Sequence, residues 1–334
     1  MDIHEVKSIP MPSNPSLGNP VEPSVWRARL HSVGYPNSRF LARGMEGLIF
    51  HLGEDGLVAK IWTTRSFAHV EKLQTFYAEL SLRHLPFTTP QILELRLVQG
   101  AVVSIERELR GTPLRQAVHD QPEVLPSAIV DSLISVLRSL ASVAGDDRLS
   151  LPVLDEEWPL WRGHTRWGTA FAGLLQRRVA RFGDTLRKSV SNFDPKLQRI
   201  LTLLIAQEPR PLGIVHGDLV PPNILVDQRL RPTAVLDFGF LSTVGDPAFD
   251  AAVATSTFDM YGPHAARIEH QLAMAVEAEF GYRPQALALY KAAYAVATAN
   301  AYDPNGRDGH FAWCVQMLER PDIISLLSSA AAGS

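Results

Sequence analysis

The sequence predicts an α+β protein with a small β-rich N-terminal lobe and a larger, mainly helical C-terminal lobe. Two patterns predict this class. Short apolar runs bounded by glycine and turn residues fill residues 40–109, whereas apolar residues after Gly111 recur at helical spacing. The chain has 334 residues, of which 46% are hydrophobic and 20% charged, so it is long and apolar enough for two sizeable cores.

The N-terminal part begins with a segment that shows no apolar period. Residues 1–24 are rich in proline, serine and asparagine and predict a flexible arm. Residues 25–110 form the predicted N-lobe, which contains a twisted hairpin, one helix and two further strands. These elements are predicted at 48–52 and 57–62, joined by a turn at Asp55-Gly56, then at 66–84, 90–97 and 101–109.

The predicted C-lobe covers residues 111–334 and is helical for most of its length. Apolar residues at helical spacing mark three helices, around 129–140, 171–180 and 197–205. Two short β-runs, 224–226 and 234–236, interrupt this pattern. From residue 248 to 327 the chain is rich in alanine and predicts three or four more helices.

Composition excludes several classes of partner. The formal net charge of −3 gives no basic field that would attract nucleic acid or an anionic membrane. Cys314 is the only cysteine, so neither an intrachain disulfide nor a thiolate-rich metal site can form. There is no secretory pattern at the N-terminus and no apolar run of about 18 residues, so we expect a cytoplasmic protein. The sequence leaves the oligomeric state open.

The chemistry-bearing residues lie on two neighbouring segments. Val215-His-Gly-Asp-Leu-Val-Pro-Pro-Asn-Ile-Leu-Val226 places Asp218 and Asn223 on a loop that enters a strand, and Val235-Leu-Asp-Phe-Gly239 ends a strand at Asp237. Phosphoryl transfer needs a base near the attacking hydroxyl and metal ligands near the phosphates. Carboxylate and amide oxygens are the ligands that Mg²⁺ prefers. Asp, Asn and Gly also dominate ordinary turns, but the combined spacing and the flanking strands favour the catalytic interpretation.

His-Gly-Asp-x-x-x-x-Asn, Asp-Phe-Gly and Gly245-Asp-Pro-Ala-Phe-Asp250 resemble the aminoglycoside phosphotransferase and choline kinase superfamily. The resemblance covers about residues 40–260, and its specific part is 213–252. It implies a bilobal, protein-kinase-like fold and an enzyme that phosphorylates a hydroxyl group of a small molecule. ATP or GTP and Mg²⁺ are the implied cofactors, with the nucleotide between the two lobes.

The resemblance also implies roles for individual residues. Asp218 would be the catalytic base, and Asn223 and Asp237 would bind magnesium. His216 and Asp250 would support the catalytic loop by hydrogen bonds. Two positions depart from the family pattern: Val220 and Pro222 stand where a polar residue and a glycine are common. Neither departure removes a group that the chemistry needs.

The N-lobe supplies weaker candidates for nucleotide binding. Lys60, in Val-Ala-Lys-Ile, matches the strand lysine that contacts the α- and β-phosphates in this architecture, although a lone strand lysine usually faces water. Glu79 is its expected helix partner and Glu71 the second choice; either could be a solvated helix charge. Gly44 and Gly47 lie where a phosphate-covering loop belongs, with an ordinary hairpin turn as the alternative. Position alone predicts that the connector residues contact adenine: Glu106, Glu108 and Leu109.

The sequence disfavours a protein substrate, in agreement with the small-molecule acceptor that the resemblance implies. No Ala-Pro-Glu follows Asp-Phe-Gly, so the platform for a peptide substrate is missing. An antibiotic of the aminoglycoside type is the first candidate. A choline-, amino alcohol- or sugar-type metabolic substrate is the alternative, and a nucleotide-binding scaffold without activity is a third possibility.

Two groups of residues could bind a cationic acceptor. Trp158, Trp161 and Trp167 lie beside Glu156 and Glu157 and could form cation–π contacts, or could simply pack helices together. In the C-terminal region, acidic residues could face a polyamine or could be solvated helix charges. They are Asp259, Glu277, Glu279, Asp303 and Asp308.

Overall fold

The computed structural model describes residues 22–44, 46–53, 56–118, 122–145 and 149–328. The predicted arm therefore lies almost entirely outside the described residues, as does Asp55 of the predicted turn. The α+β class is confirmed, with a β-sheet in the N-terminal part and helices in the C-terminal part. The chain divides into two compact units, Met1–Arg65 with Glu94–Glu108 and Ser66–Leu93 with Leu109–Ser334.

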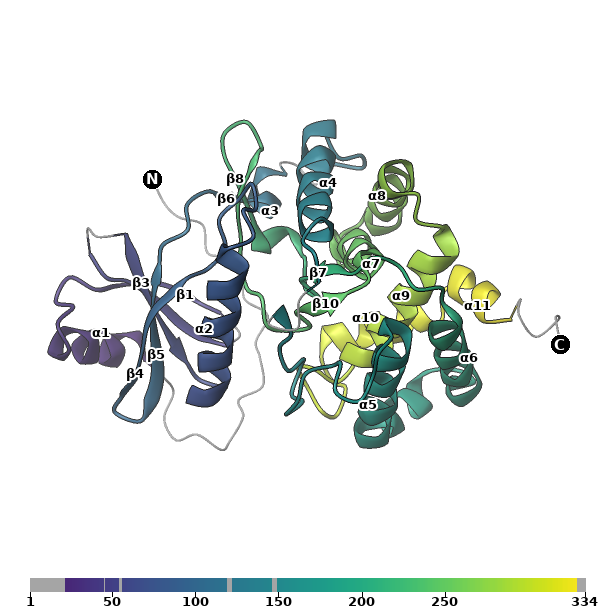
Figure 1. Ribbon diagram of the computed structural model, residues 1–334, viewed down its shortest axis with the longest axis horizontal. Helices are drawn as coiled ribbons and strands as arrows, with labels where there is room; N and C mark the ends of the chain where they lie inside the picture. Colours follow the sequence, from purple (N-terminus) through teal and green to yellow (C-terminus); the bar gives the residue numbers. More distant parts are fainter. Residues whose placement is uncertain (1–21, 45, 54–55, 119–121, 146–148, 329–334) are drawn as a thin grey trace. The chain divides into compact units, whose positions relative to one another are not determined.

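A five-stranded sheet carries the first unit (Figure 1). Its strand order is β1-β2-β3-β5-β4. The strands are β1 (Arg39–Arg43), β2 (Gly47–His51), β3 (Leu57–Trp62), β4 (Ile92–Val98) and β5 (Ala101–Arg107). β2 and β3 form the predicted hairpin, in which Phe50 lies opposite Ala59. The predicted strands near 90–97 and 101–109 are β4 and β5.

The core of the first unit lies between this sheet and α1 (Pro23–Ser32). Trp26 and Leu30 of α1 are buried in one cluster with Phe50, Ile61 and other strand residues. The sequence does not predict α1, because only these two of its ten residues are buried and the apolar period is too short to see. Proline at the first helical position starts the helix without losing a hydrogen bond.

The helix α2 (Phe67–Ser81) follows the predicted range and begins after Ser66, whose hydroxyl accepts a hydrogen bond from the N–H of His69. Contacts group this helix with the second unit. The Tyr77 hydroxyl donates to the carbonyl oxygen of Phe238, at 3.4 Å, and the Phe76 ring packs against the Phe238 ring. The compact units differ from the predicted lobes over residues 66–93, which cluster with the chain from Leu109 onward. The predicted lobe boundary at 110/111 therefore stays a prediction.

Two small sheets bring the motif-bearing segments together inside the second unit. One contains β6 (Thr112–Pro113), β8 (Ile224–Val226) and β9 (Pro232–Val235); the other pairs β7 (Gly213–Val215) with β10 (Thr243–Gly245). The two short strands that the sequence predicted are β8 and β9. The pair β7 and β10 was not predicted, because three residues are too few to show alternation.

Helices build the rest of the second unit. They are α3 (Leu114–Ala117), α4 (Ser127–Ala141), α5 (Trp167–Ser189), α6 (Phe193–Ala206), α7 (Pro247–Thr257), α8 (Ala265–Phe280), α9 (Pro284–Thr298), α10 (Gly309–Leu318) and α11 (Pro321–Ser328). The prediction of three or four helices after residue 248 is wrong, since five lie within the fully described stretch 247–328. Short breaks at Gly281 and near residue 319 divide what the alanine-rich pattern presents as longer runs.

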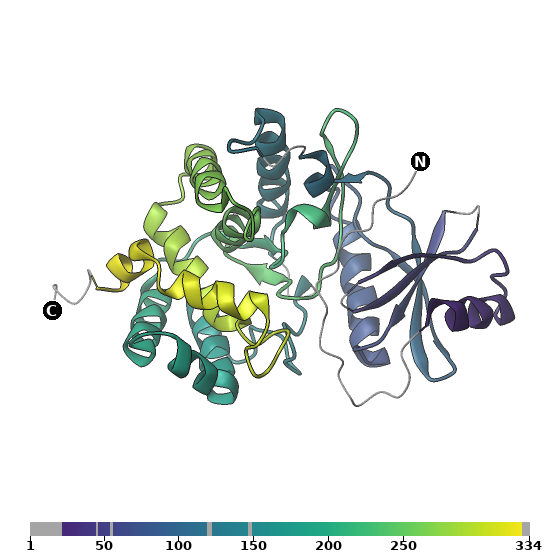
Figure 2. The same ribbon diagram turned by 180° about the vertical axis from the view of Figure 1, so that it is seen from behind.

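The helices α7 and α9 form the centre of this unit, with the other helices around them (Figures 1 and 2). Every residue of α7 from Ala248 to Thr257 is buried, as is almost all of α9. Alanine makes this close packing possible, and a helix that is apolar on all sides belongs in a core. Among the described residues, no helix is long and apolar enough to cross a membrane.

We predict that buried His310 makes the stability of the protein sensitive to acid. Its ring contacts Thr298 Oγ1 at 2.9 Å, and burial lowers the pKa of His310 from 6.5 to about 4. Between these values the unfolded chain binds more protons than the folded one, so the free energy of unfolding rises with pH from about 4 to 6.5 and is lost on acidification. This histidine accounts for on the order of 3 kcal/mol of that change.

The substitution His310→Gln should flatten the pH dependence of the free energy of unfolding, measured by urea denaturation between pH 4.5 and 7. His216 contributes with the same sign and Asp250 with the opposite sign, so the difference between variant and parent isolates His310. The exposed His270→Gln controls for loss of a surface imidazole. Parallel curves for His310→Gln and the parent would show that the buried ring does not titrate as expected.

Candidate active site

A buried carboxylate fixes the backbone of the catalytic loop. Asp250 Oδ2 accepts the N–H of His216 at 2.6 Å and Oδ1 accepts the N–H of Gly217 at 2.8 Å. Gly217 has φ +79°, and a Cβ there would lie 2.7 Å from the backbone of Leu241, so only glycine fits. Burial raises the pKa of Asp250 to about 7, while the two N–H donors act in the opposite direction. Asp250, on the central helix α7, thereby sets the conformation of the residue before Asp218.

The imidazole of His216 ties the loop to the end of β9. Its Nδ1 accepts the N–H of Asp218, at 3.2 Å, so the ring proton is on Nε2, which donates to the carbonyl oxygen of Leu236 at 2.7 Å. The ring is fully buried and burial lowers its pKa to about 4. His216 is therefore a neutral cross-link between the segments that carry Asp218 and Asp237. These contacts are those of the support role that the sequence predicted for His216 and Asp250.

Asn223 connects the same two segments from the other side. Its Nδ2 donates to the carbonyl oxygen of Asp218 at 3.0 Å, and its own carbonyl oxygen accepts the N–H of Leu236 at 2.8 Å. The loop closes through a short 3-10 turn, η2 (Pro221–Asn223), in which Pro222 is exposed. Val220 contributes its N–H to the carbonyl oxygen of Asp218. The two departures from the family pattern therefore fit the loop without displacing Asn223.

The structure brings the three predicted polar residues to one place in the second unit. The side chain of Asp218 is partly exposed, and that of Asp237 is exposed on a backbone with φ +53°. A left-handed conformation is tolerated by aspartate and is common at functional sites. The hydrogen bonds through His216 and Asn223 hold these two carboxylate-bearing segments side by side.

The donor set of this region fits magnesium rather than a metal held only by protein. Within the described residues no group of three or more His, Cys, Asp or Glu side chains gathers as a metal site. Mg²⁺ is usually held by one or two carboxylates together with phosphate oxygens and waters. Asn223 uses its Nδ2 inside the loop, so its amide oxygen is the atom available to a cation. That oxygen and the Asp237 carboxylate are the hard ligands this ion prefers.

In the first unit, Lys60 contacts an acid that the sequence analysis missed. Its Nζ lies 3.0 Å from Glu46 Oε2, and Arg65 Nε lies 2.9 Å from Glu46 Oε1. The pKa of Glu46 is lowered: burial acts against this, but the two cations outweigh it. The ammonium also lies 3.8 Å from the centre of the Trp62 ring. Glu46 belongs to the predicted phosphate loop, a turn whose path sequence spacing does not reveal.

The other N-terminal candidates occupy defined positions whose roles stay predictions. Gly47 begins β2, where a Cβ would overlap the Ile61 carbonyl, so close strand approach accounts for this glycine. The N–H of Gly44 donates to the carbonyl oxygen of Gly47 at 2.9 Å. Glu79 of α2 lies 3.8 Å from Arg83, one turn further along the helix.

The predicted adenine connector begins inside the sheet of the first unit. Glu106 lies on β5 and its carboxylate accepts the Ser104 hydroxyl at 2.5 Å. The N–H of Glu108 donates to the carbonyl oxygen of Gly56, and its carboxylate lies 3.6 Å from His51. Leu109 is the first residue of the second unit after this strand. Its contact with adenine stays a prediction.

The tryptophans have structural partners. The Trp161 ring donates its N–H to the carbonyl oxygen of Val244, and Trp167 stacks on Phe171 with 5.2 Å between ring centres. Trp158 is 54% exposed, but Arg162 covers its ring at 3.8 Å. These contacts favour the packing interpretation over a cage for a cationic acceptor.

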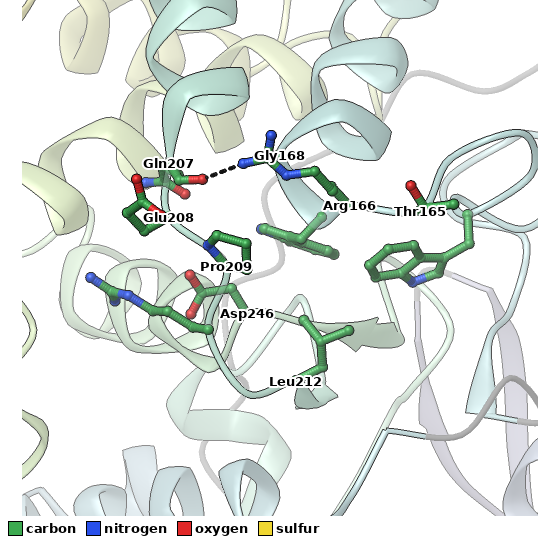
Figure 3. A pocket seen from close by; sticks show the side chains of 11 residues that line it. Thr165, Arg166, Gly168, Gln207, Glu208, Pro209, Leu212 and Asp246 are labelled. Carbon is green, nitrogen blue, oxygen red and sulfur yellow. Dashed lines mark hydrogen bonds between the residues drawn. The ribbon is translucent and has the colours of Figure 1, made fainter.

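Trp161 and Trp167 also line a cavity of about 90 Å³ that contains none of the predicted catalytic or metal residues (Figure 3). It lies at the end of the β7–β10 pair away from the catalytic loop, beside Leu212 and Asp246. Arg166 closes one side through a hydrogen bond to the carbonyl oxygen of Gln207. Asp246 itself is engaged, because it caps α7 at Ala248 N and accepts the Tyr290 hydroxyl.

The chain belongs to the phosphotransferase enzyme family, whose model, APH, matches residues 37–294. The predicted resemblance is therefore confirmed. The protein is a small-molecule kinase, a phosphotransferase with an alcohol group as acceptor. No curated protein matches the chain in sequence.

Solved structures share the fold at low identity. The complex of aminoglycoside phosphotransferase APH(3'')-Id from Streptomyces rimosus with ADP and streptomycin is 18% identical over 85% of this chain and 98% of its own, with a TM-score of 0.54. The gentamicin complex of APH(2")-IIa is 14% identical over 92% and 99%, with a TM-score of 0.60. Ethanolamine kinase from Plasmodium vivax is 11% identical over 88% and 83%, with a TM-score of 0.52.

We predict that Asp250→Asn damages both the loop and turnover. An amide can accept only one of the two N–H groups and turns its own NH₂ toward the other, which should lower the free energy of unfolding by about 1–3 kcal/mol. Displacement of the loop should lower kcat by about tenfold to a hundredfold. Denaturation and steady-state kinetics measure the two effects. Asp246→Asn, which keeps a capping oxygen on the same helix, is the matched control; equal effects of the two variants would contradict the special role of Asp250.

Proposed function

We propose that this protein transfers the γ-phosphoryl group of ATP to a hydroxyl group of a small molecule, with Asp218 as the catalytic base. One observation carries the proposal: Asn223 binds the Asp218 carbonyl through its side chain and the Leu236 N–H through its backbone. This supports a site in which a proposed base, Asp218, lies on segments joined to the two candidate metal ligands, Asn223 and Asp237. Solved relatives of the same fold are complexes with ADP, ATP or GDP, which supports a nucleotide donor.

The proposed reaction needs little covalent participation from the protein. The Asp218 carboxylate accepts the proton of the acceptor hydroxyl while the hydroxyl oxygen forms a bond to the γ-phosphorus. The bond between the γ-phosphorus and the β,γ-bridging oxygen breaks, which releases ADP. The backbone of Asp218 forms three hydrogen bonds, with His216, Val220 and Asn223, and these restrict the position of the carboxylate. Magnesium, when bound, neutralises phosphate charge, and Asn223 and Asp237 are the residues that would hold it.

The first unit supplies the proposed phosphate contacts. Lys60 is the proposed ligand of the α- and β-phosphates, and Gly44 and Gly47 flank the covering loop. Glu79 remains the proposed helix partner of Lys60. Since Glu46 contacts Lys60, phosphate binding would compete with this carboxylate for the ammonium group.

The proposed acceptor is an antibiotic, and the alternative is a metabolic alcohol. Structural neighbours with bound streptomycin and gentamicin favour the first, and a neighbouring ethanolamine kinase favours the second. A scaffold without activity has no need for the base at Asp218, so it is the least supported reading. We place the enzyme in the cytoplasm, where ATP is abundant.

We predict that Asp218→Asn abolishes turnover but leaves nucleotide affinity within about twofold. Removing a general base typically lowers the rate by about 10²–10⁴-fold, and we expect a loss of kcat of this order. The measurement is ADP release across aminoglycosides, macrolides, peptide antibiotics, choline and amino alcohols. Asp227→Asn, in the exposed turn after β8, controls for loss of an acid. Full activity of Asp218→Asn would refute the assignment; nucleotide binding without turnover on any compound would favour the scaffold.

We further predict that Asp237→Ala removes the magnesium-dependent part of nucleotide affinity. Loss of one of two protein ligands should weaken ATP binding with magnesium by about tenfold or more, equivalent to about 1.4 kcal/mol. Titration calorimetry with magnesium and with EDTA separates this effect from general damage, because affinity in EDTA should match the parent. An unchanged affinity in magnesium would rule Asp237 out as a ligand.

A further inference from the structure

An aromatic pair lies close to the catalytic loop, because Phe240 precedes Leu241, whose backbone lies 2.7 Å from the position that a Cβ on Gly217 would take. Phe240 follows Asp237 by three residues, and Tyr302, in the segment after α9, stacks on it with 5.9 Å between ring centres and 11° between planes. Both rings are partly exposed. The Phe240 carbonyl oxygen accepts the N–H of Leu154, which fixes this segment. Burial raises the pKa of Tyr302, which keeps its hydroxyl protonated.

The acidic residues that a polycation would need are mostly neutralised. Asp259 lies 3.0 Å from Arg115, Glu279 lies 2.6 Å from Arg138, and Asp303 lies 3.1 Å from Arg307. In the 155–175 segment, Glu156 pairs with Arg177 at 2.6 Å. A polyamine would have to break such pairs, and each arginine would repel it.

Asp308 differs from these acids. Its Oδ1 caps α10 by accepting the N–H of Phe311 at 2.8 Å, whereas its enclosed Oδ2 has no hydrogen-bond partner among the described residues. It lies near the aromatic pair in the chain, two residues before His310, whose ring packs edge-to-face on Tyr302 with 5.0 Å between ring centres. An enclosed carboxylate oxygen without a partner is costly, and one ammonium group beside it would offset that cost.

We propose, on the basis of the phosphotransfer proposed above, that the acceptor is a hydroxylated ring compound with no more than one positive charge. The ring face packs on Tyr302 and Phe240, a hydroxyl group reaches Asp218, and Asp308 balances a single amine where one is present. Apolar ring faces gain from aromatic surface without any need for charge. Within the antibiotic and alcohol classes proposed above, this disfavours polycationic aminoglycosides and small ringless amines as the preferred substrates.

The acceptor panel tests this proposal directly. Erythromycin represents a ring glycoside with one amine, methyl glucoside a neutral ring, gentamicin a polycation and choline a ringless cation. We expect kcat/KM for erythromycin or methyl glucoside to exceed that for gentamicin and choline by about tenfold or more, with KM changing less than about twofold between 50 and 300 mM salt. A preference for gentamicin or choline, or a steep rise of KM with salt, would overturn the inference while leaving the phosphotransfer function intact.

Substitutions at Tyr302 and Asp308 test which of these side chains binds the acceptor. Tyr302→Ala should raise the acceptor KM by about tenfold and leave the KM for ATP unchanged, whereas Tyr302→Phe should retain acceptor binding. Asp308→Asn keeps the α10 cap and should raise KM about fivefold for erythromycin but not for methyl glucoside. Asp303→Asn, a nearby acid already paired with arginine, is the matched control. Equal effects on both acceptors, or equal effects of the two Asp variants, would overturn the role of Asp308.

Direct binding separates this inference from the proposed function. Calorimetry with Asp218→Asn and each of the four compounds ranks affinity without turnover. If no compound releases ADP with the parent enzyme, the phosphotransfer proposal loses its support, yet the ranking still tests the acceptor class. Tighter binding of gentamicin than of the ring compounds would then overturn it.

Discussion

Two backbone N–H groups, those of His216 and Gly217, converge on the buried carboxylate of Asp250, and the geometry of the candidate site depends on this interaction. The carboxylate sits on α7, which is buried on all sides, so it cannot move without disturbing the core of the second unit. Gly217 adopts the left-handed backbone conformation that this interaction requires, and Asp218 is the next residue in the chain. A rigid central helix thus positions a catalytic loop that has almost no regular structure of its own.

Two further residues link the loop to the end of β9. His216 and Asn223 each form hydrogen bonds both to Asp218 and to Leu236. The residues that follow β9 therefore keep their position relative to the catalytic loop. These links are neutral. Neither His216 nor Asn223 therefore adds a charge next to Asp218 and Asp237.

The sequence predicted the part of the site that is local. Asp218, Asn223 and Asp237 sit within one run of chain whose spacing follows from a loop, a strand and a turn, and the structure brings them together as expected. Lys60 illustrates the limit, because its contact with Glu46 crosses from β3 to the preceding loop and depends on side-chain geometry. The strands β7 and β10 were invisible for a different reason: at three residues each, only their pairing defines them.

The charge balance of the helical unit could not be predicted from the sequence either. Arg115 and Asp259 are 144 positions apart, so no local pattern shows that they meet. Read along the chain, the C-terminal acids suggest a receptor for a polyamine; in the folded chain several of them already have arginine partners. An ion pair that is partly buried resists exchange, because a ligand amine must compensate both the lost pair and the freed guanidinium. In the acceptor site proposed above, these ion pairs would restrict which cationic acceptors can bind, and the aromatic surface of Phe240 and Tyr302 would be the larger source of acceptor binding.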